Sequence, residues 1–376
     1  KAIMRIIFKT LIFIVIILAL IALAIFIFIK TSSQFGAFPD GDSKKIIQNS
    51  KNFINGKFVN LNPVPVNTND ASTRPNEKRA TLMDWISPAK DKNPLKSLPS
   101  IKFQIKNLTE GKFIWLGHST LLMNTGGLIV MTDPVFNRAS PLPIFGKPFS
   151  IENPIIIDDL PKVNVVVISH DHYDHLDTRA IKDLSKKVDR FFVPLGIKAH
   201  LESWGVDKNK ISELDWHDSE NYKGIKFILK PAQHFSGRGL SDGNETLWGS
   251  WIINSSTMKV FFSGDGGYSK TFKELGGMYG PFDIAFIENG AYSANWSKIH
   301  MFPDEVVQAT IDLNAKVLFP IHWGKFDLAI HPWDEPIIRV TDEAKKQKVN
   351  IATPMIGEVF DLINLPITHW WKSLRN

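Results

Sequence analysis

Short apolar runs and segments of helical periodicity alternate along the chain from residue 112 onward. A run of four to six apolar residues bounded by polar or turn residues is typical of a buried strand, whereas apolar positions three and four apart predict an amphipathic helix. The strands come first in pairs and then alternate with helices, which favours two sheets with helices outside. The predicted strands are 113–116, 127–131, 163–168, 191–194, 225–229, 248–253, 260–262, 284–287 and 317–321, and the predicted helices are 178–187, 197–204, 303–313 and 335–346.

The first 108 residues follow a different pattern. Residues 10–29 form an uncharged run of 20 residues rich in Ile, Leu and Phe, bracketed by Lys9 and Lys30. A helix of about 20 residues is needed to cross about 30 Å of hydrocarbon, and the apolar cores of signal peptides are shorter. An uncleaved membrane anchor is therefore favoured over a cleaved signal peptide. Residues 31–108 are rich in Asn, Lys, Ser and Pro and predict a linker with an irregular arm that packs on the main domain.

These patterns divide the chain into four parts. We expect a single-pass N-terminal anchor at 1–30, a linker and arm at 31–108, the main domain at 109–362 and a C-terminal tail at 363–376. The tail carries Trp370 and Trp371 beside Lys372, for which packing on the domain and contact with a membrane interface are alternatives. Basic residues flank the apolar run on both sides, so the side of the membrane that carries the main domain stays open.

The charge of the chain is concentrated at its N-terminal end. Residues 1–30 carry four basic side chains and no acid, residues 31–100 carry ten basic and six acidic ones, and the rest carries 30 basic and 32 acidic ones. Basic residues beside an apolar helix favour attraction to anionic lipid over nucleic-acid binding. The chain has no cysteine, so disulfides and thiolate metal sites are excluded and any metal must be held by His and carboxylate.

The densest chemical signal lies directly after the predicted strand 163–168. Residues 170–175 read His-Asp-His-Tyr-Asp-His. Polar groups so concentrated must be solvated, paired or bound to metal. His170 and His172 can aim at one ion, and Asp174 and His175 can reach a second ion nearby. Nitrogen and oxygen donors without thiolate suit zinc, with iron or manganese as alternatives.

Further candidate residues stand at the ends of other predicted strands. Because such ends meet at one rim of a sheet, these side chains are expected to converge. His118, His234, Asp265 and His322 share this position. We interpret Asp133 as a hydrogen-bond acceptor beside the metal ligands rather than a ligand, and His118 as either an orienting residue or a core histidine. Arg238 lies in a segment expected to form a mobile loop, where contact with a phosphate and simple solvation are alternatives.

The chain resembles a known family in many ordered motifs. They include the His-x-His-x-Asp-His run and the distant His, Asp and His of the metallo-β-lactamase fold. Within that fold the chain is similar to the N-acyl-phosphatidylethanolamine-hydrolysing phospholipase D family over about residues 110–360. The matching segments are 117–120, 132–136, 138–141, 168–177, 192–196, 213–216, 247–251, 264–265 and 321–324.

This resemblance implies an α/β fold, an αββα four-layer sandwich, and a zinc-dependent phosphodiester hydrolase acting on membrane phospholipid. It implies two zinc ions, with Asp265 bridging them. Asp174 and His300 are the candidate catalytic residues, and His300 would stand near the substrate phosphate. The implied ligands are His170, His172 and His234 for one ion and Asp174, His175 and His322 for the other.

The sequence departs from the family pattern at three places, which leaves the substrate open. Gly266 replaces the usual Thr after the bridging Asp, residues 288–290 replace an Ile-Gly-type segment, and the long anchor is absent from the mammalian pattern. A lactonase or other ester hydrolase, and a non-catalytic membrane-tethered module, are the alternatives. The expected partners are a phospholipid and the bilayer, a second copy of the chain is an open alternative, and no nucleic acid is expected.

Overall fold

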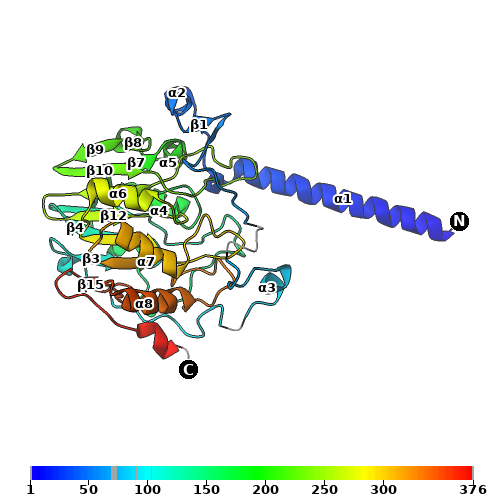
Figure 1. Ribbon diagram of the computed structural model, residues 1–376. Coiled ribbons are helices and arrows are strands. Elements are labelled where there is room, and N and C mark those ends of the chain that lie inside the picture. Colours follow the sequence, from blue (N-terminus) through cyan, green and yellow to red (C-terminus); the bar gives the residue numbers. More distant parts are fainter. Residues whose placement is uncertain (1, 69–73, 90, 103, 375–376) are drawn as a thin grey trace.

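The structure is a computed structural model that describes residues 2–68, 74–89, 91–102 and 104–374. Within these residues two large β-sheets pack face to face (Figure 1). The seven-stranded sheet has the order β15 (Val359–Phe360), β3 (Phe113–Trp115), β4 (Leu121–Thr125), β5 (Leu128–Thr132), β6 (Val163–Val167), β7 (Val188–Pro194) and β8 (Ile211–Leu214). The six-stranded sheet has the order β14 (Leu318–Ile321), β13 (Ile284–Glu288), β12 (Lys259–Phe262), β11 (Ser250–Asn254), β10 (Ile225–Lys230) and β9 (Ser219–Tyr222).

Each sheet combines antiparallel and parallel pairs. In the first sheet β3, β4 and β5 are antiparallel, and β5 to β8 run parallel. In the second sheet β9 to β12 are antiparallel, whereas β12, β13 and β14 run parallel. β6, β12, β13 and β14 all take part in parallel pairs, so within each sheet the carboxyl ends of these strands lie at the same end. The loops that follow these strands leave the sheets there.

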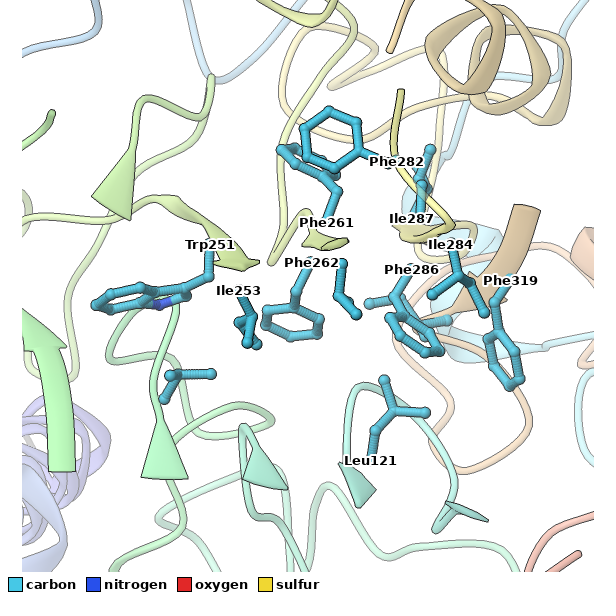
Figure 2. Close-up of a cluster of buried hydrophobic side chains, with 14 of the residues drawn as sticks. Leu121, Trp251, Ile253, Phe261, Phe262, Phe282, Ile284, Phe286, Ile287 and Phe319 are labelled. Carbon is cyan, nitrogen blue, oxygen red and sulfur yellow. The ribbon is translucent and has the colours of Figure 1, made fainter. Parts of the chain in front are cut away.

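The core between the sheets is built from residues at every second position, since side chains of a strand alternate between its two faces. Val165 and Val167 of β6 belong to the cluster that fills this space, whereas Val166 belongs to the cluster on the outer face. Figure 2 shows Trp251, Ile253, Phe262 and Phe286 of the second sheet in a row, with Leu121 of the first sheet opposite them.

Helices cover both outer faces. The short helices α4 (Thr178–Leu184) and α5 (Ile197–Ser203) bury Ile181 and Leu201 against the first sheet. On the second sheet, α7 packs on β13 and β14, and α6 and α8 flank α7. The bounds of these helices are Thr271–Tyr279 for α6, Pro303–Asp312 for α7 and Glu335–Gln347 for α8. The resulting order is helix, sheet, sheet, helix, as the resemblance predicts.

The N-terminal quarter combines an isolated helix with an arm on the domain surface. Helix α1 (Ala2–Thr31) projects from the body and buries none of its residues (Figure 1). Its 30 residues span about 45 Å, so by length and composition it could cross a membrane. The arm holds α2 (Gly41–Asn49), β1 (Phe53–Ile54), β2 (Lys57–Phe58) and α3 (Leu82–Ile86). Ile47 and Phe58 of the arm are buried in the central core.

All predicted strands and helices are present, with ends shifted by a few residues, and several elements were missed. The missed elements of the main domain are β4, β8, β9, β15 and α6. β9 is a polar edge strand in which no residue is buried, and α6 carries two adjacent glycines that obscure its helical pattern. In the tail, Trp370 and Trp371 are buried, and both pack on Trp323. Of the two alternatives for the tail, the structure therefore shows packing on the domain.

Candidate metal centre

The loop after β6 presents the His-x-His-x-Asp-His run in one fixed conformation. A turn closes on His172, whose carbonyl accepts hydrogen bonds from the amides of His175 and Leu176. Directly after it, Asp177 caps α4 by accepting from the amides of Arg179 and Ala180. Strand β6 and helix α4 thus hold the two ends of the loop, so its polar side chains project from a rigid scaffold.

Three histidines form a first cluster. The Nε2 atom of His170 lies 2.8 Å from Nδ1 of His172, and Nε2 of His234 lies 3.3 Å from the same atom. The Nδ1–H of His234 can donate to the carbonyl of Ile299 at 3.0 Å, which leaves its Nε2 lone pair for the cluster. These three ring nitrogens can hold one divalent ion.

A second cluster lies beside the first. Oδ2 of Asp174 is 3.1 Å from Nε2 of His322 and 3.4 Å from Nε2 of His175. His118 joins this group, because its Nε2 is 3.1 Å from the same carboxylate oxygen. His118 therefore touches a ligand candidate directly, which agrees with an orienting role rather than an isolated core histidine.

Asp265, which follows β12, lies between the two clusters. Its Oδ2 atom is 2.9 Å from Nε2 of His322, 3.2 Å from Nε2 of His175 and 3.9 Å from Nε2 of His234. One carboxylate thus reaches nitrogens of both clusters, as a residue shared by two ions must. The glycine before it is needed for packing, since a Cβ at Gly264 would lie 2.5 Å from the Cβ of Ser169.

Asp133 sits behind the centre and orients its ligands. Its carboxylate accepts from the Ser169 amide at 2.7 Å, from the Ser169 hydroxyl at 2.5 Å and from Nδ1–H of His175 at 2.7 Å. The last bond leaves Nε2 of His175 facing Asp265 and Asp174. Carboxylates that bind the second nitrogen of a metal-ligating His are a common feature of metal sites.

Unusual backbone conformations gather at this centre. The backbone φ angles are 56° at His118, 32° at Asp133 and 68° at His322. Residues other than glycine rarely adopt such positive values. Such conformations cost free energy and persist where the surrounding structure enforces them, commonly at functional sites. Their coincidence at three residues of one centre points to a site shaped for chemistry rather than for stability.

The electrostatics of the site favour a bound cation. Burial would lower the pKa of His322, but the carboxylates of Asp265 and Asp174 raise it to about 10. Burial, and then the charge of Asp265, raise the pKa of Glu288 well above its usual range. Several carboxylates therefore share one buried space, where negative charge is costly unless protons or metal ions offset it.

The donor atoms left without partners fit a metal centre. Among the described residues, Nε2 of His175 and Oδ1 of Asp265 are buried and lack an aligned hydrogen-bond partner. Buried polar atoms are normally satisfied, and a divalent ion between the clusters would satisfy both. The set consists of imidazole nitrogens and carboxylate oxygens alone, which suits zinc, iron or manganese.

One side of the centre reaches solvent. His172, Asp174 and His300 are partly exposed, whereas the other ligand candidates are buried. Nδ1 of His300 lies 2.9 Å from Oε2 of Glu288, which leaves Nε2 as the nitrogen that can exchange a proton with a substrate. Glu288 is fully buried and also accepts from the Met301 amide, so it fixes the segment that carries His300.

Arg238 occupies a different place from the one expected. It is buried, and its guanidinium donates to the carbonyls of Asp171, Leu176 and Gln34. The guanidinium also stacks on the ring of Tyr173 at 4.1 Å. Arg238 therefore ties the metal-binding loop to the start of the arm, and its hydrogen bonds account for it without a phosphate.

Two further sets of contacts around the metal centre were missed from the sequence. Asn60 of the arm accepts from the amide of His234 and donates to its carbonyl at 2.8 Å. Asp171 accepts from the Gly237 amide and the Thr246 hydroxyl, and Nε2 of His200 lies 3.5 Å from it. No local pattern marks such partners, because they are distant in sequence from the residues that they hold.

Comparison with known proteins places this centre in a family. A sequence model described as a β-lactamase superfamily domain matches residues 129–323. An uncharacterized protein of Mycobacterium tuberculosis is 38% identical over 337 residues, covering 88% of this chain and 89% of the relative. N-acyl-phosphatidylethanolamine-hydrolyzing phospholipase D 1 of Caenorhabditis elegans is 35% identical over 266 residues, covering 66% of this chain and 74% of the relative.

A solved structure agrees at the level of the fold. A metallo hydrolase from Ignicoccus hospitalis superposes with a TM-score of 0.52 at 20% identity, covering 66% of this chain and 97% of the other. The candidate metal ligands lie within residues 129–323, the range that the family model matches, and His118 lies shortly before it. The chain belongs to the metallo-β-lactamase superfamily, as a metal-dependent hydrolase with relatives among the N-acyl-phosphatidylethanolamine-hydrolysing phospholipases D.

Proposed function

We propose that the chain is a zinc-dependent phosphodiester hydrolase of the phospholipase D type that acts on N-acyl-phosphatidylethanolamine in a membrane. The observation that carries this proposal is the place of the metal loop beside the end of α1. The ring of Phe35 lies 5.6 Å from that of Phe28 in α1 and 6.5 Å from that of Tyr173 in the loop. A helix able to span a bilayer would thus hold the centre at the lipid surface.

The residues of the centre suit hydrolysis at phosphorus. Two bound zinc ions would polarise the phosphoryl oxygens and make water a stronger nucleophile. Asp174, partly exposed, would take a proton from the attacking water. His300, held through Nδ1 by Glu288, would give a proton to the leaving N-acylethanolamine oxygen. The water oxygen forms the new bond to phosphorus, the phosphorus–alkoxide bond breaks, and phosphatidic acid remains.

An isotope experiment tests the bond that is cleaved. The full-length protein in mixed micelles is given N-acyl-phosphatidylethanolamine in ¹⁸O-labelled water, and the products are analysed by mass spectrometry. We expect one label in the phosphate of phosphatidic acid and none in the N-acylethanolamine. Label in a released fatty acid, or hydrolysis of a lactone without turnover of the phospholipid, would show an ester hydrolase instead.

A metal-site variant links this test to the centre. Asp265→Ala removes the carboxylate that approaches both clusters, so equal product formation by this variant would contradict catalysis at this centre. Elemental analysis of protein that has never met a chelator should show about two zinc ions per chain, and only a trace of metal would contradict the proposal.

A further inference from the structure

The level of a bilayer relative to the main domain follows from α1, if α1 is the anchor. Its apolar run ends at Ile29, and Phe28 and Ile29 are already half-buried against the domain. The next residues bind the domain directly, because the carbonyl of Ser33 accepts from the indole of Trp204 at 2.6 Å. No flexible spacer therefore separates the helix from the domain, and parts of the domain beside this junction must meet lipid.

A first set of exposed apolar residues lies at this junction, next to a cavity. The cavity has a volume of about 610 Å³ and is bounded by Phe28 of α1, by Tyr173 and by the segment 137–143. The same segment continues into an exposed apolar tip, with Ile144 77% and Phe145 58% exposed. Leu240 is 86% exposed, two residues after Arg238, which lines the same cavity and is bonded to the Gln34 carbonyl.

A second apolar group is α3. Leu82, Met83, Trp85 and Ile86 are all exposed, and no residue of this helix is buried. α3 projects from the body on the same side as α1 (Figure 1). Single exposed apolar residues are ordinary, but a helix that turns nearly all its apolar side chains to solvent marks an interaction surface.

Basic residues accompany these apolar groups. Arg138 and Lys182 line the cavity at the junction together with Asp183, and the exposed Lys78 stands beside α3, where it pairs with Asp84. Apolar side chains flanked by Lys, Arg and Trp are typical of segments that lie in a membrane interface, with apolar atoms in the acyl region and cations at the phosphates.

We propose that α3, the segment 142–145 and Leu240 form a docking surface that enters the same bilayer as α1. The inference rests on the membrane anchoring proposed above and adds where the domain itself touches lipid. With contacts at the α1 junction and at α3, apart from it, the domain cannot swing freely about its anchor. The exposed side of the metal centre is then held towards lipid head groups.

The absence of cysteine from the chain allows a direct test. Met83, Ile144 and Leu240 are replaced one at a time by Cys in the full-length protein, labelled with an environment-sensitive fluorophore and reconstituted in phosphatidylcholine–phosphatidylglycerol vesicles. Met278 of α6, 63% exposed like Met83, is the matched control away from α1. We expect blue-shifted emission, quenched by lipids brominated in their acyl chains, at the first three positions and water-like emission at position 278.

A label at Ile16→Cys, in the middle of α1, reports the anchor itself. Quenching at position 16 together with water-like emission at 83, 144 and 240 would overturn the docking surface and leave the anchor standing. No quenching at position 16 would overturn both. The fluorescence does not depend on turnover, so failure of the proposed reaction in the isotope experiment remains a separate result.

Discussion

At the scale of single residues, the centre depends on how each imidazole is turned. A histidine offers either nitrogen to a metal, and the hydrogen bond on the other nitrogen decides which one. His175 is set by Asp133 and His234 by the carbonyl of Ile299. The ligand geometry therefore resides as much in these partners as in the histidines.

Asp133→Asn tests this orientation. The amide keeps the size of the side chain but has one acceptor in place of two, so it cannot accept from Ser169 and His175 as the carboxylate does. We expect a loss of about 10–100-fold in metal affinity or turnover, measured by dialysis against graded chelator and by initial rates. Asp189→Asn, which alters an exposed ion pair with Lys162, is the control and should change neither.

Asp265→Ala should be more damaging, because the carboxylate of Asp265 approaches Nε2 atoms of both clusters. We expect more than about 100-fold loss of turnover, the upper range for an orienting residue, together with loss of most bound metal. Metal content is measured per folded chain, with circular dichroism as the check of folding. Activity and metal content like those of the unaltered protein would refute the shared position of Asp265.

At the scale of elements, the two adjacent glycines of α6, Gly276 and Gly277, differ in the space around them, because only Gly276 packs closely against α7. A Cβ at Gly276 would lie 2.0 Å from the carbonyl oxygen of Asp312 at the end of α7, whereas a Cβ at Gly277 meets nothing within 4 Å. Close approach of two helices thus requires glycine at the first position. The second position carries only the conformational cost of glycine in a helix.

Two alanine variants should therefore change stability in opposite directions. Gly276→Ala forces α6 and α7 apart and should lower the free energy of unfolding by about 1–3 kcal/mol. Gly277→Ala should raise it by about 0.5–1 kcal/mol, because alanine loses less conformational entropy in a helix. Urea unfolding followed by circular dichroism compares the two, and equal effects would contradict the packing described.

At the scale of the whole molecule, α1 touches the domain only near its C-terminal end and contributes little to the domain's packing. Neither hydrophobic cluster contains a residue of α1. Removal of residues 1–31 should therefore leave a folded protein that hydrolyses a water-soluble phosphodiester at close to the full-length rate. The shortened protein should be released from membranes by alkaline carbonate, whereas the full-length protein should stay bound. Loss of the soluble activity on removal of α1 would show that the helix supports the domain itself.

The sequence by itself determined the features that depend on local pattern. Hydrophobic periodicity is a property of neighbouring residues, so it predicted the apolar helix and most strands of the two sheets. The run from His170 to His175 indicated a metal site because several of its candidate metal ligands are neighbours in the sequence. The polar edge strand β9 and the glycine-containing α6 escaped because their local pattern is weak.

Only the tertiary structure decided which distant groups meet. Sheet packing and strand register place Asp265 between two clusters, set Glu288 behind His300 and bring Asn60 of the arm onto His234. These contacts join residues up to 174 positions apart. The free energy that each contact contributes depends on the three-dimensional position of its partner. The position of α3 and Leu240 around α1 has the same origin, because exposure of a side chain depends on what the folded chain leaves uncovered.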